Sequence, residues 1–212
     1  GLGDVTAFAD VDATFVEGKP GVEADINGFF STASPNYDGQ SFTDLLTAQQ
    51  VGVYPGSSVT GKHGYEFEGA VEGQPRVAAH GAAIALNVKF KGDTALVRTI
   101  VLGRNTALAA SANGTAYQHG AASAAQQVYG VLRAISVAGG PGTLDVKIQS
   151  DNAEGFLSAT DVLTFTQLAA AGVEVKTANG AITDDWWRVV FTVAGGGTWD
   201  VLGVFGIRPL SA

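Results

Sequence analysis

The sequence contains no cysteine, which excludes disulfide bonds, thiolate metal ligands and cysteine nucleophiles. Charged side chains are also scarce, because they make up 15% of the 212 residues, compared with about 25% in an average globular chain. No apolar run approaches the ~18 residues of a membrane-spanning helix. The first residues show no basic segment followed by an apolar one, so we expect neither membrane insertion nor a signal peptide.

Positive charge is the sign that the chain lacks most. It carries 20 acidic and 12 basic residues, for a formal net charge of −8. Residues 1–44 hold eight Asp and Glu residues against a single base, Lys19, whereas residues 105–212 hold eight acids against five bases. A surface that grips nucleic acid needs a basic stripe, so we expect no specific binding of DNA.

What the chain does contain is apolar sequence with a period of two, which is typical of half-buried strands. The predicted strands are Val22–Asn27, Tyr65–Glu68, Ile84–Lys91, Val128–Val137, Leu144–Gln149, Val162–Leu168, Val173–Thr177, Trp186–Val193 and Trp199–Ile207. Clusters of turn-forming residues separate several of them, at Gly139–Gly142, Asn179–Gly180 and Gly195–Gly197.

One segment, Ser41–Gln50, predicts a helix instead. It offers a Ser or Thr N-cap, an early Asp44 and Gly52 as a stop signal, and Phe42 and Leu45 recur at helical spacing. A helix this short must pack on a sheet to be stable.

The sequence predicts two β domains with a boundary near Gly103–Arg104. Residues 105–127 carry no charge, and the strands after them lie about 8–12 residues apart, as in sandwiches and jelly rolls. We therefore expect a mainly β protein. Residues 1–103 would form a β-sandwich or barrel with one short helix, and residues 104–212 a jelly-roll-like β-sandwich.

No pattern for catalysis or for a cofactor stands out. The three histidines, His63, His80 and His119, lack metal-ligand spacing, and there is no G-x-S-x-G motif. Gly139–Gly142 is not followed by the Lys-Ser/Thr of a phosphate loop. We expect a protein that is not an enzyme and that has no cofactor.

Acidic side chains give equally weak signals for a metal or a catalytic pair. Ser150–Gly155 offers oxygen atoms to calcium but lacks the EF-hand spacing. The pairs Asp10/Asp12 and Asp184/Asp185 fit solvated strand faces and turns better than paired catalytic carboxylates. We therefore predict no metal site.

Trp186 and Trp187 are the most informative aromatic pair. Adjacent residues on a strand face opposite ways, so one tryptophan is expected in the core and the other outside. The outer ring would stack on a sugar, or would be covered by a loop or a neighbouring subunit.

The order of the N-terminal segments carries a family resemblance. Leu2–Asp10 is followed by Phe15–Gly18, then by Val22–Phe30 and by the predicted helix Ser41–Gln50. In this order they resemble the major tail tube proteins of long-tailed bacteriophages, with a "D-V-T-x-F-G-D" segment and a strand ending in "G-F-F-D". Ala9 and Ser31 depart from that pattern.

The second half is similar to β-sandwich modules appended to such proteins, which are akin to discoidin-like carbohydrate-binding sandwiches. The segments that carry this likeness are Val128–Val137, Leu144–Ser150, Leu163–Thr166, Trp187–Thr192 and Val201–Arg208.

The resemblance implies a virion protein of the tail, assembled in the bacterial cytoplasm. Its subunits would form stacked hexameric rings, with other tail proteins at the tube ends and DNA passing through without specific binding. The acids expected to line the lumen are Asp4, Asp10, Asp12, Glu23 and Asp25. Trp186 and Trp187 would contact host glycans or neighbouring subunits. The alternatives are a head decoration or tail completion protein, and a carbohydrate-binding sandwich protein.

Overall fold

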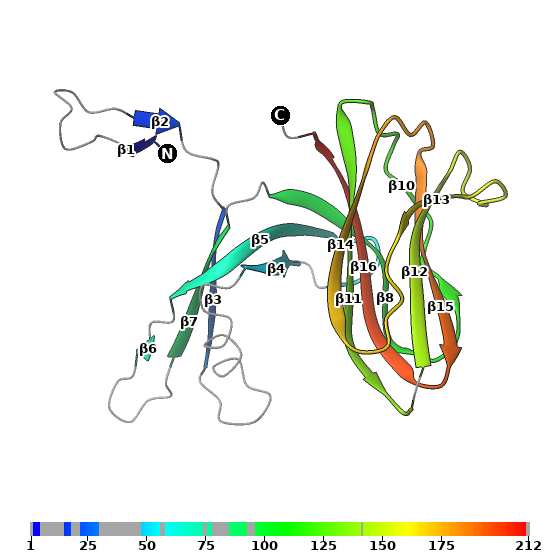
Figure 1. The fold of residues 1–212 in the computed structure, drawn as a ribbon, viewed down its shortest axis with the longest axis horizontal. Helices are drawn as coiled ribbons and strands as arrows, with labels where there is room; N and C mark the ends of the chain where they lie inside the picture. The colour runs from blue at the N-terminus through cyan, green and yellow to red at the C-terminus, as the bar shows by residue number, and fades with distance from the viewer. Residues whose placement is uncertain are drawn as a thin grey trace. The chain divides into compact units, whose positions relative to one another are not determined.

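The computed structural model describes residues 2–4, 15–17, 22–29, 48–55, 58–73, 76–77, 85–92, 96–140 and 142–210 (Figure 1). Every regular element among these residues is a β-strand, which confirms the predicted mainly β class. The chain divides into two compact units. The smaller comprises Gly1–Val51 and Glu66–Leu96, and the larger comprises Gly52–Tyr65 and Val97–Ala212.

The smaller unit is built on an antiparallel sheet in which β7 lies between β3 and β5. β1 and β2 pair with each other, β4 pairs with β5, and β6 pairs with β7. The last residues of β4 and the first three of β5 belong to the larger unit. The strands are β1 (Leu2–Asp4), β2 (Phe15–Glu17), β3 (Val22–Phe29), β4 (Ala48–Val53), β5 (His63–Gly73), β6 (Arg76–Val77) and β7 (Ala85–Gly92).

Phe67 and Glu66 are buried in the smaller unit. The Phe67 ring lies so close to Gly69 and Gly92 that a Cβ atom on either would come within 2.9 Å of it. Glu66, adjacent on β5, accepts a hydrogen bond of 2.8 Å from Nε2 of Gln50. A buried carboxylate is costly unless it is hydrogen bonded, so this contact helps Glu66 to be accommodated.

The larger unit is a sandwich of two antiparallel sheets (Figure 1). The first sheet has the order β14-β11-β16-β8, and the second has the order β10-β15-β12-β13, with β9 also paired to β15. The strands are β8 (Val97–Leu108), β9 (Ala112–Asn113), β10 (Tyr117–Gln118), β11 (Gln126–Ala138), β12 (Gly142–Asp151), β13 (Thr160–Thr164), β14 (Gly172–Asn179), β15 (Trp186–Gly195) and β16 (Thr198–Pro209).

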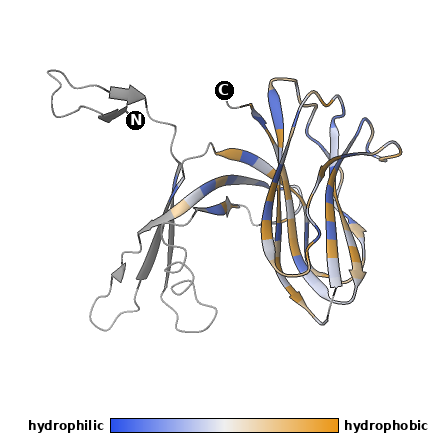
Figure 2. Cartoon of the chain, viewed as in Figure 1, coloured by the Kyte–Doolittle hydropathy of each residue, from blue (hydrophilic) through white to orange (hydrophobic). Residues whose placement is uncertain are grey.

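The core lies between the two sheets. Figure 2 shows the alternation of hydrophobic and hydrophilic residues along β12, whose Val146 and Ile148 point inward and are completely buried. Trp187 of the second sheet stacks on Phe205 of the first, with ring centroids 4.3 Å apart. Gly130 lets the sheets approach, because a Cβ there would lie 2.7 Å from Ile148 Cδ1. Close packing of this kind makes the core sensitive to changes of volume.

Two of the predicted turns, at the Gly139 and Gly195–Gly197 clusters, are confirmed. Gly139 and Gly140 join β11 to β12 with φ of +87° and +124°, and Gly195 and Gly197 flank the β15–β16 turn with φ of +76° and +99°. A positive φ of this kind favours glycine, because glycine has no Cβ atom to clash with the backbone.

Each predicted strand overlaps an observed one, but three findings differ from expectation. Of the predicted helix, residues 41–47 lie outside the described residues, and the last three, Ala48–Gln50, begin β4 and are extended. The strand β8 was not expected, and the boundary predicted at Gly103–Arg104 falls inside it. The compact units divide instead at residues 51/52, 65/66 and 96/97.

Candidate functional site

The described residues contain no group of three or more metal-ligating side chains. His63 is exposed at the start of β5, His119 follows β10, and His80 lies outside the described residues. Within the same part of the chain, no helix is long and apolar enough to cross a membrane.

His119 is the histidine with the most contacts. Its ring meets Phe205 edge to face, with centroids 5.2 Å apart. Partial burial lowers the pKa of His119, and the positive charges of His63 and Arg98 lower it further, against a smaller opposing effect of a backbone hydrogen bond. Phe205, His63 and Arg98 are neither carboxylates nor nucleophiles, so these neighbours give His119 no partner for general acid–base catalysis.

In Ser150–Gly155, the segment considered for calcium, the carboxylate of Asp151 accepts hydrogen bonds from the loop that follows it. Asp151 is buried, and its two oxygens accept hydrogen bonds from the backbone N–H groups of Ala153 at 3.1 Å and Ser158 at 2.8 Å. The neighbouring Ser150 hydroxyl donates to Asp184 at 2.7 Å. The Asp151 bonds close the loop between β12 and β13, and the Ser150 bond ties β12 to the segment that precedes β15.

The tryptophan pair lies at the start of β15, and the predicted alternation is confirmed. Trp187 is completely buried, and its Nε1 donates a hydrogen bond of 3.0 Å to the Gly120 carbonyl. Trp186 is half-buried and lies opposite Gln118 of β10 and Asp151 of β12. Only Trp186 therefore has surface that a ligand or another subunit could contact.

The outer face of the first sheet, which points away from the second sheet, is also apolar. Residues opposite each other in an antiparallel pair share a face, and Val131 faces Val204, which faces Val101. All three are buried in a second hydrophobic cluster, against which Tyr54 packs. This cluster is separate from the core between the sheets.

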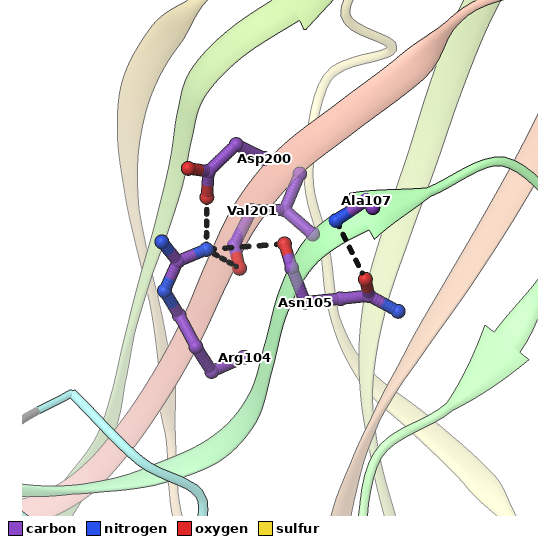
Figure 3. A network of polar contacts seen from close by, with 5 residues as sticks. All are labelled: Arg104, Asn105, Ala107, Asp200 and Val201. Atoms are coloured by element: carbon purple, nitrogen blue, oxygen red, sulfur yellow. Dashed lines mark hydrogen bonds and ion pairs between the residues drawn. The ribbon is translucent and has the colours of Figure 1, made fainter.

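Arginines border this cluster. Arg208 holds its guanidinium 4.9 Å from the Tyr129 ring centroid, and its Nε and Nη2 donate to Oε1 of Gln127 at 3.0 and 2.8 Å. Figure 3 shows Arg104, whose Nη1 forms an ion pair with Asp200 and donates to the Val201 carbonyl at 3.0 Å. The guanidinium groups are thus held in place by hydrogen bonds at the rim of the cluster.

Toward β14 the outer face is uncovered. Val175 lies opposite Val131, and Val173 lies opposite Arg133. Their exposed fractions are 37% and 52%, and the nearby Ile135 of β11 is 53% exposed. We call Ile135, Val173 and Val175 the apolar patch. Exposed apolar groups that adjoin one another mark interaction surfaces more often than isolated ones do.

The polar side chains of β14 explain why its valines point outward. Glu174 accepts hydrogen bonds from Thr166 N at 2.7 Å and Oγ1 at 2.8 Å, and it pairs with Lys176 Nζ at 2.8 Å. Burial raises the pKa of Glu174, but the bonds from Lys176 and Thr166 outweigh it, so the pKa is lowered overall. Because successive side chains alternate, tying Glu174 to Thr166 turns Val173 and Val175 outward.

β14 is also an edge strand, since no second strand among the described residues pairs with it beyond β11. An edge presents unpaired N–H and C=O groups to another chain, and proteins usually block long edges with charge, proline or a bulge. The eight residues of β14 contain no proline, but they include Glu174 and Lys176, charges of the kind that block an edge. The surface suited to protein contact is therefore the apolar patch rather than the edge itself.

The acids predicted for a lumen lie on β1 and β3, with Asp10 and Asp12 outside the described residues. In the register of β3 and β7, Glu23 lies opposite Lys91 and Asp25 lies opposite Lys89. This strand register places a lysine position opposite each of these two acids, which composition could not reveal.

Sequence reasoning missed the apolar patch. The alternation at Val173–Thr177 was visible, but it could not show which side of the strand would be covered. Ile135 follows the register shift after Ala134, a local irregularity that leaves no signal in the residue types.

No family model matches this chain, and no curated protein matches it. Among solved structures, it is similar to the crystal structure of the SPP1 Dit (gp 19.1) protein, described as a paradigm of the hub adsorption apparatus in phages that infect Gram-positive bacteria. The alignment covers 98% of this chain and 88% of that one, with 10% sequence identity and a TM-score of 0.28. A similarity at this level does not identify the family.

Proposed function

We propose that this chain is a structural protein of a bacteriophage tail that assembles with copies of itself, as stacked rings, into the tail tube. The resemblance of the ordered segments Leu2–Asp10, Phe15–Gly18 and Val22–Phe30 to tail tube proteins motivates the family. The single observation that carries self-assembly is the apolar patch on β11 and β14.

A role in assembly fits the physical character of this surface. Val173 and Val175 are held outward by a strand whose polar side chains are bonded to the sandwich. Burying exposed aliphatic side chains against another copy would stabilise the assembly by roughly 25 cal/mol per Å². When the same contact is repeated from subunit to subunit and its rotation adds up to a full turn, the subunits form a closed ring. In a closed ring every copy of the apolar patch is covered by a neighbour.

Passage of DNA through such a tube requires a wall that does not hold phosphate. The acids predicted to line the lumen, among them Glu23 and Asp25, would repel phosphate rather than bind it. In this proposal they give the tube an acidic wall along which the genome slides during ejection.

Electron microscopy of the purified chain tests the proposal. Rings or tubes are expected at high protein concentration, together with a sedimentation coefficient that rises with concentration. Discrete monomers at every concentration would contradict it.

The alternatives give different results. A tail completion or head decoration protein would be present in a virion as one ring or on the capsid, whereas a tube protein is present in many stacked rings. A carbohydrate-binding protein would give signal on a glycan array, and replacing half-buried Trp186 with alanine would abolish that signal.

A further inference from the structure

Three basic side chains gather in the larger unit. His63 begins β5, Arg98 is the second residue of β8, and His119 directly follows β10. All three residues are exposed. Basic residues are scarce in this chain, with 12 against 20 acids, so their convergence at one place calls for a physical reason. We call His63, Arg98 and His119 the basic cluster.

The pairing of β5 with β8 places two members of the cluster on one face of the first sheet. Val101 N donates a hydrogen bond of 2.9 Å to the Lys62 carbonyl. The next residue, His63, therefore lies opposite Ile100, which belongs to the core between the two sheets. Arg98 is two residues from Ile100 on β8, so its side chain leaves the strand on that same side.

His119 reaches this face from the second sheet. Phe205 lies opposite Ile100 in the register of β16 and β8. The His119 ring meets Phe205 edge to face, with centroids 5.2 Å apart, and Tyr117 adds a second ring 6.4 Å from His119. Phe205, Ile100 and His63 are thus successive positions across the first sheet, and the His119 imidazole packs on this row.

The three groups of the basic cluster are close enough to repel one another. Partial burial lowers the pKa of His119, and the positive charges of His63 and Arg98 lower it further, against a smaller opposing effect of a backbone hydrogen bond. Like charges held together are unfavourable unless an opposite charge accompanies them. The arrangement therefore favours an anion beside these groups.

The carboxylate that comes nearest along the chain does not fill this role. The Asp185 backbone carbonyl accepts a hydrogen bond of 3.0 Å from His119 N. The Asp185 carboxylate, however, accepts a hydrogen bond of 2.6 Å from Nε2 of Gln118. Successive side chains alternate, so Gln118 and the carboxylate it holds lie on the side of β10 opposite to the His119 ring.

The other members of the cluster also lack an acidic partner among the described residues. Glu66 is three positions after His63, so it points to the other side of β5, where it accepts a hydrogen bond of 2.8 Å from Gln50. Within the part of the chain that the structure describes, no ion pair or hydrogen bond engages the side chain of Arg98 or His63. The counter-charge must come from outside these residues.

We infer that the basic cluster binds an oxyanion, a phosphate or carboxylate group, held by Arg98, His63 and His119. The planar guanidinium matches the oxygen atoms of such groups, and a protonated imidazole donates from both ring nitrogens. The bound anion supplies the missing counter-charge. The site goes beyond the proposed function, because it binds its anion whether or not the chain forms a tube. It belongs to the larger unit, whereas the acids predicted for a lumen belong to the smaller one.

Histidine signals in NMR spectra of the full chain report on the site directly. The chain has three histidines, and each signal is assigned by its loss when that histidine is replaced by glutamine. Sodium phosphate, added at pH 6 and at an ionic strength kept constant with sodium chloride, should shift the His63 and His119 signals to saturation and raise the pKa of His119. Sodium acetate is the second arm, and the anion that saturates at lower concentration identifies the source as phosphate or carboxylate.

Two results of this titration would overturn the inference. One is the absence of a saturable shift with both phosphate and acetate. The other is a response of the same size to added sodium chloride, because it would reflect general screening of charge.

Removal of single charges separates a site from bulk charge. Arg98→Gln should weaken phosphate binding about tenfold. Lys62→Gln is the matched control, because Lys62 is also exposed and adjoins His63, but it lies opposite Val101 on the other face of the sheet. This control should bind phosphate like the original chain. Equal weakening by the two substitutions would contradict the site.

The same variant gives a readout without any added anion. In Arg98→Gln the pKa of His119 should rise, because one of the two repelling charges is gone. The pKa of His119 should stay lower in Lys62→Gln. An unchanged pKa in Arg98→Gln would show that Arg98 and His119 do not share a site.

Discussion

The two faces of the first sheet are both apolar, yet they are covered to different degrees. The inner face packs against the second sheet, where Leu132 and Trp187 are completely buried. On the outer face, Val131 and Val204 are equally buried near Tyr54, but Val173 and Ile135 remain about half exposed.

This difference indicates where the chain needs a partner. An antiparallel sheet commonly has one face against the core and one solvated face of polar residues. Here the chain covers its second apolar face around β8 and β16, and none of the described residues covers the apolar patch at β14. The inner face therefore serves folding, and the uncovered part of the outer face is the part we assign to assembly.

Trp187→Ala should have the largest effect, because it removes a completely buried indole, its stack on Phe205 and its bond to Gly120. The expected loss is about 3–5 kcal/mol in the free energy of unfolding, measured by urea denaturation. Trp186→Ala is the control and should cost far less. Equal losses for the two variants would contradict the assigned faces.

Leu202→Ala tests whether the covered part of the outer face contributes to folding. Leu202 is buried in the second cluster, so truncation should cost about 2–4 kcal/mol. The same urea titration, with exposed Leu157→Ala as the comparison, checks this value. A cost below that of Leu157→Ala would show that the outer cluster does not stabilise the fold.

Acid should weaken the attachment of β14. The pKa of Glu174 in the folded chain lies below its ordinary value of 4.5, so its stabilising effect is present above that pH and is lost as the pH falls through the lowered pKa. The effect should be below about 1 kcal/mol for a pair near the surface. Urea midpoints at pH 6 and pH 3 should differ less in Glu174→Gln than in the original chain. The exposed Glu154→Gln control should keep the full difference.

Val173→Ser should have the smallest effect on folding and a clear effect on assembly. Because Val173 is half exposed on an edge strand, the substitution should change the free energy of unfolding of the protein by about 0.5 kcal/mol or less. Association followed by sedimentation should nevertheless shift to higher protein concentration. Loss of folding stability without a change in association would remove the apolar patch from the proposed interface.

Predictability from sequence differed among the strands for a physical reason. β12 and β14 alternate in polarity, so the period of two located them. β8 escaped notice because both faces of its first half are buried, which removes the alternation, and because Gly103 and Arg104 resemble a boundary. A strand buried on both sides reads as a continuous apolar run.

In the candidate site, too, local alternation was readable from the sequence and pairing between distant strands was not. Alternation predicted that Trp186 and Trp187 would separate into surface and core, and the structure confirms it. The sequence did not show that Lys91 and Lys89 lie opposite Glu23 and Asp25, because these residues are more than sixty positions apart and are placed opposite each other only by the strand register.

The sequence by itself determined the β class, the positions of most strands and turns, and the absence of thiol chemistry. These properties depend on local periodicity, backbone freedom of glycine and residue type. Only the tertiary structure decided which apolar side chains stay uncovered, including Leu157 and Val173, and which acids stand opposite bases. Exposure and pairing are set by contacts between segments far apart in the chain, and a single sequence does not state those contacts.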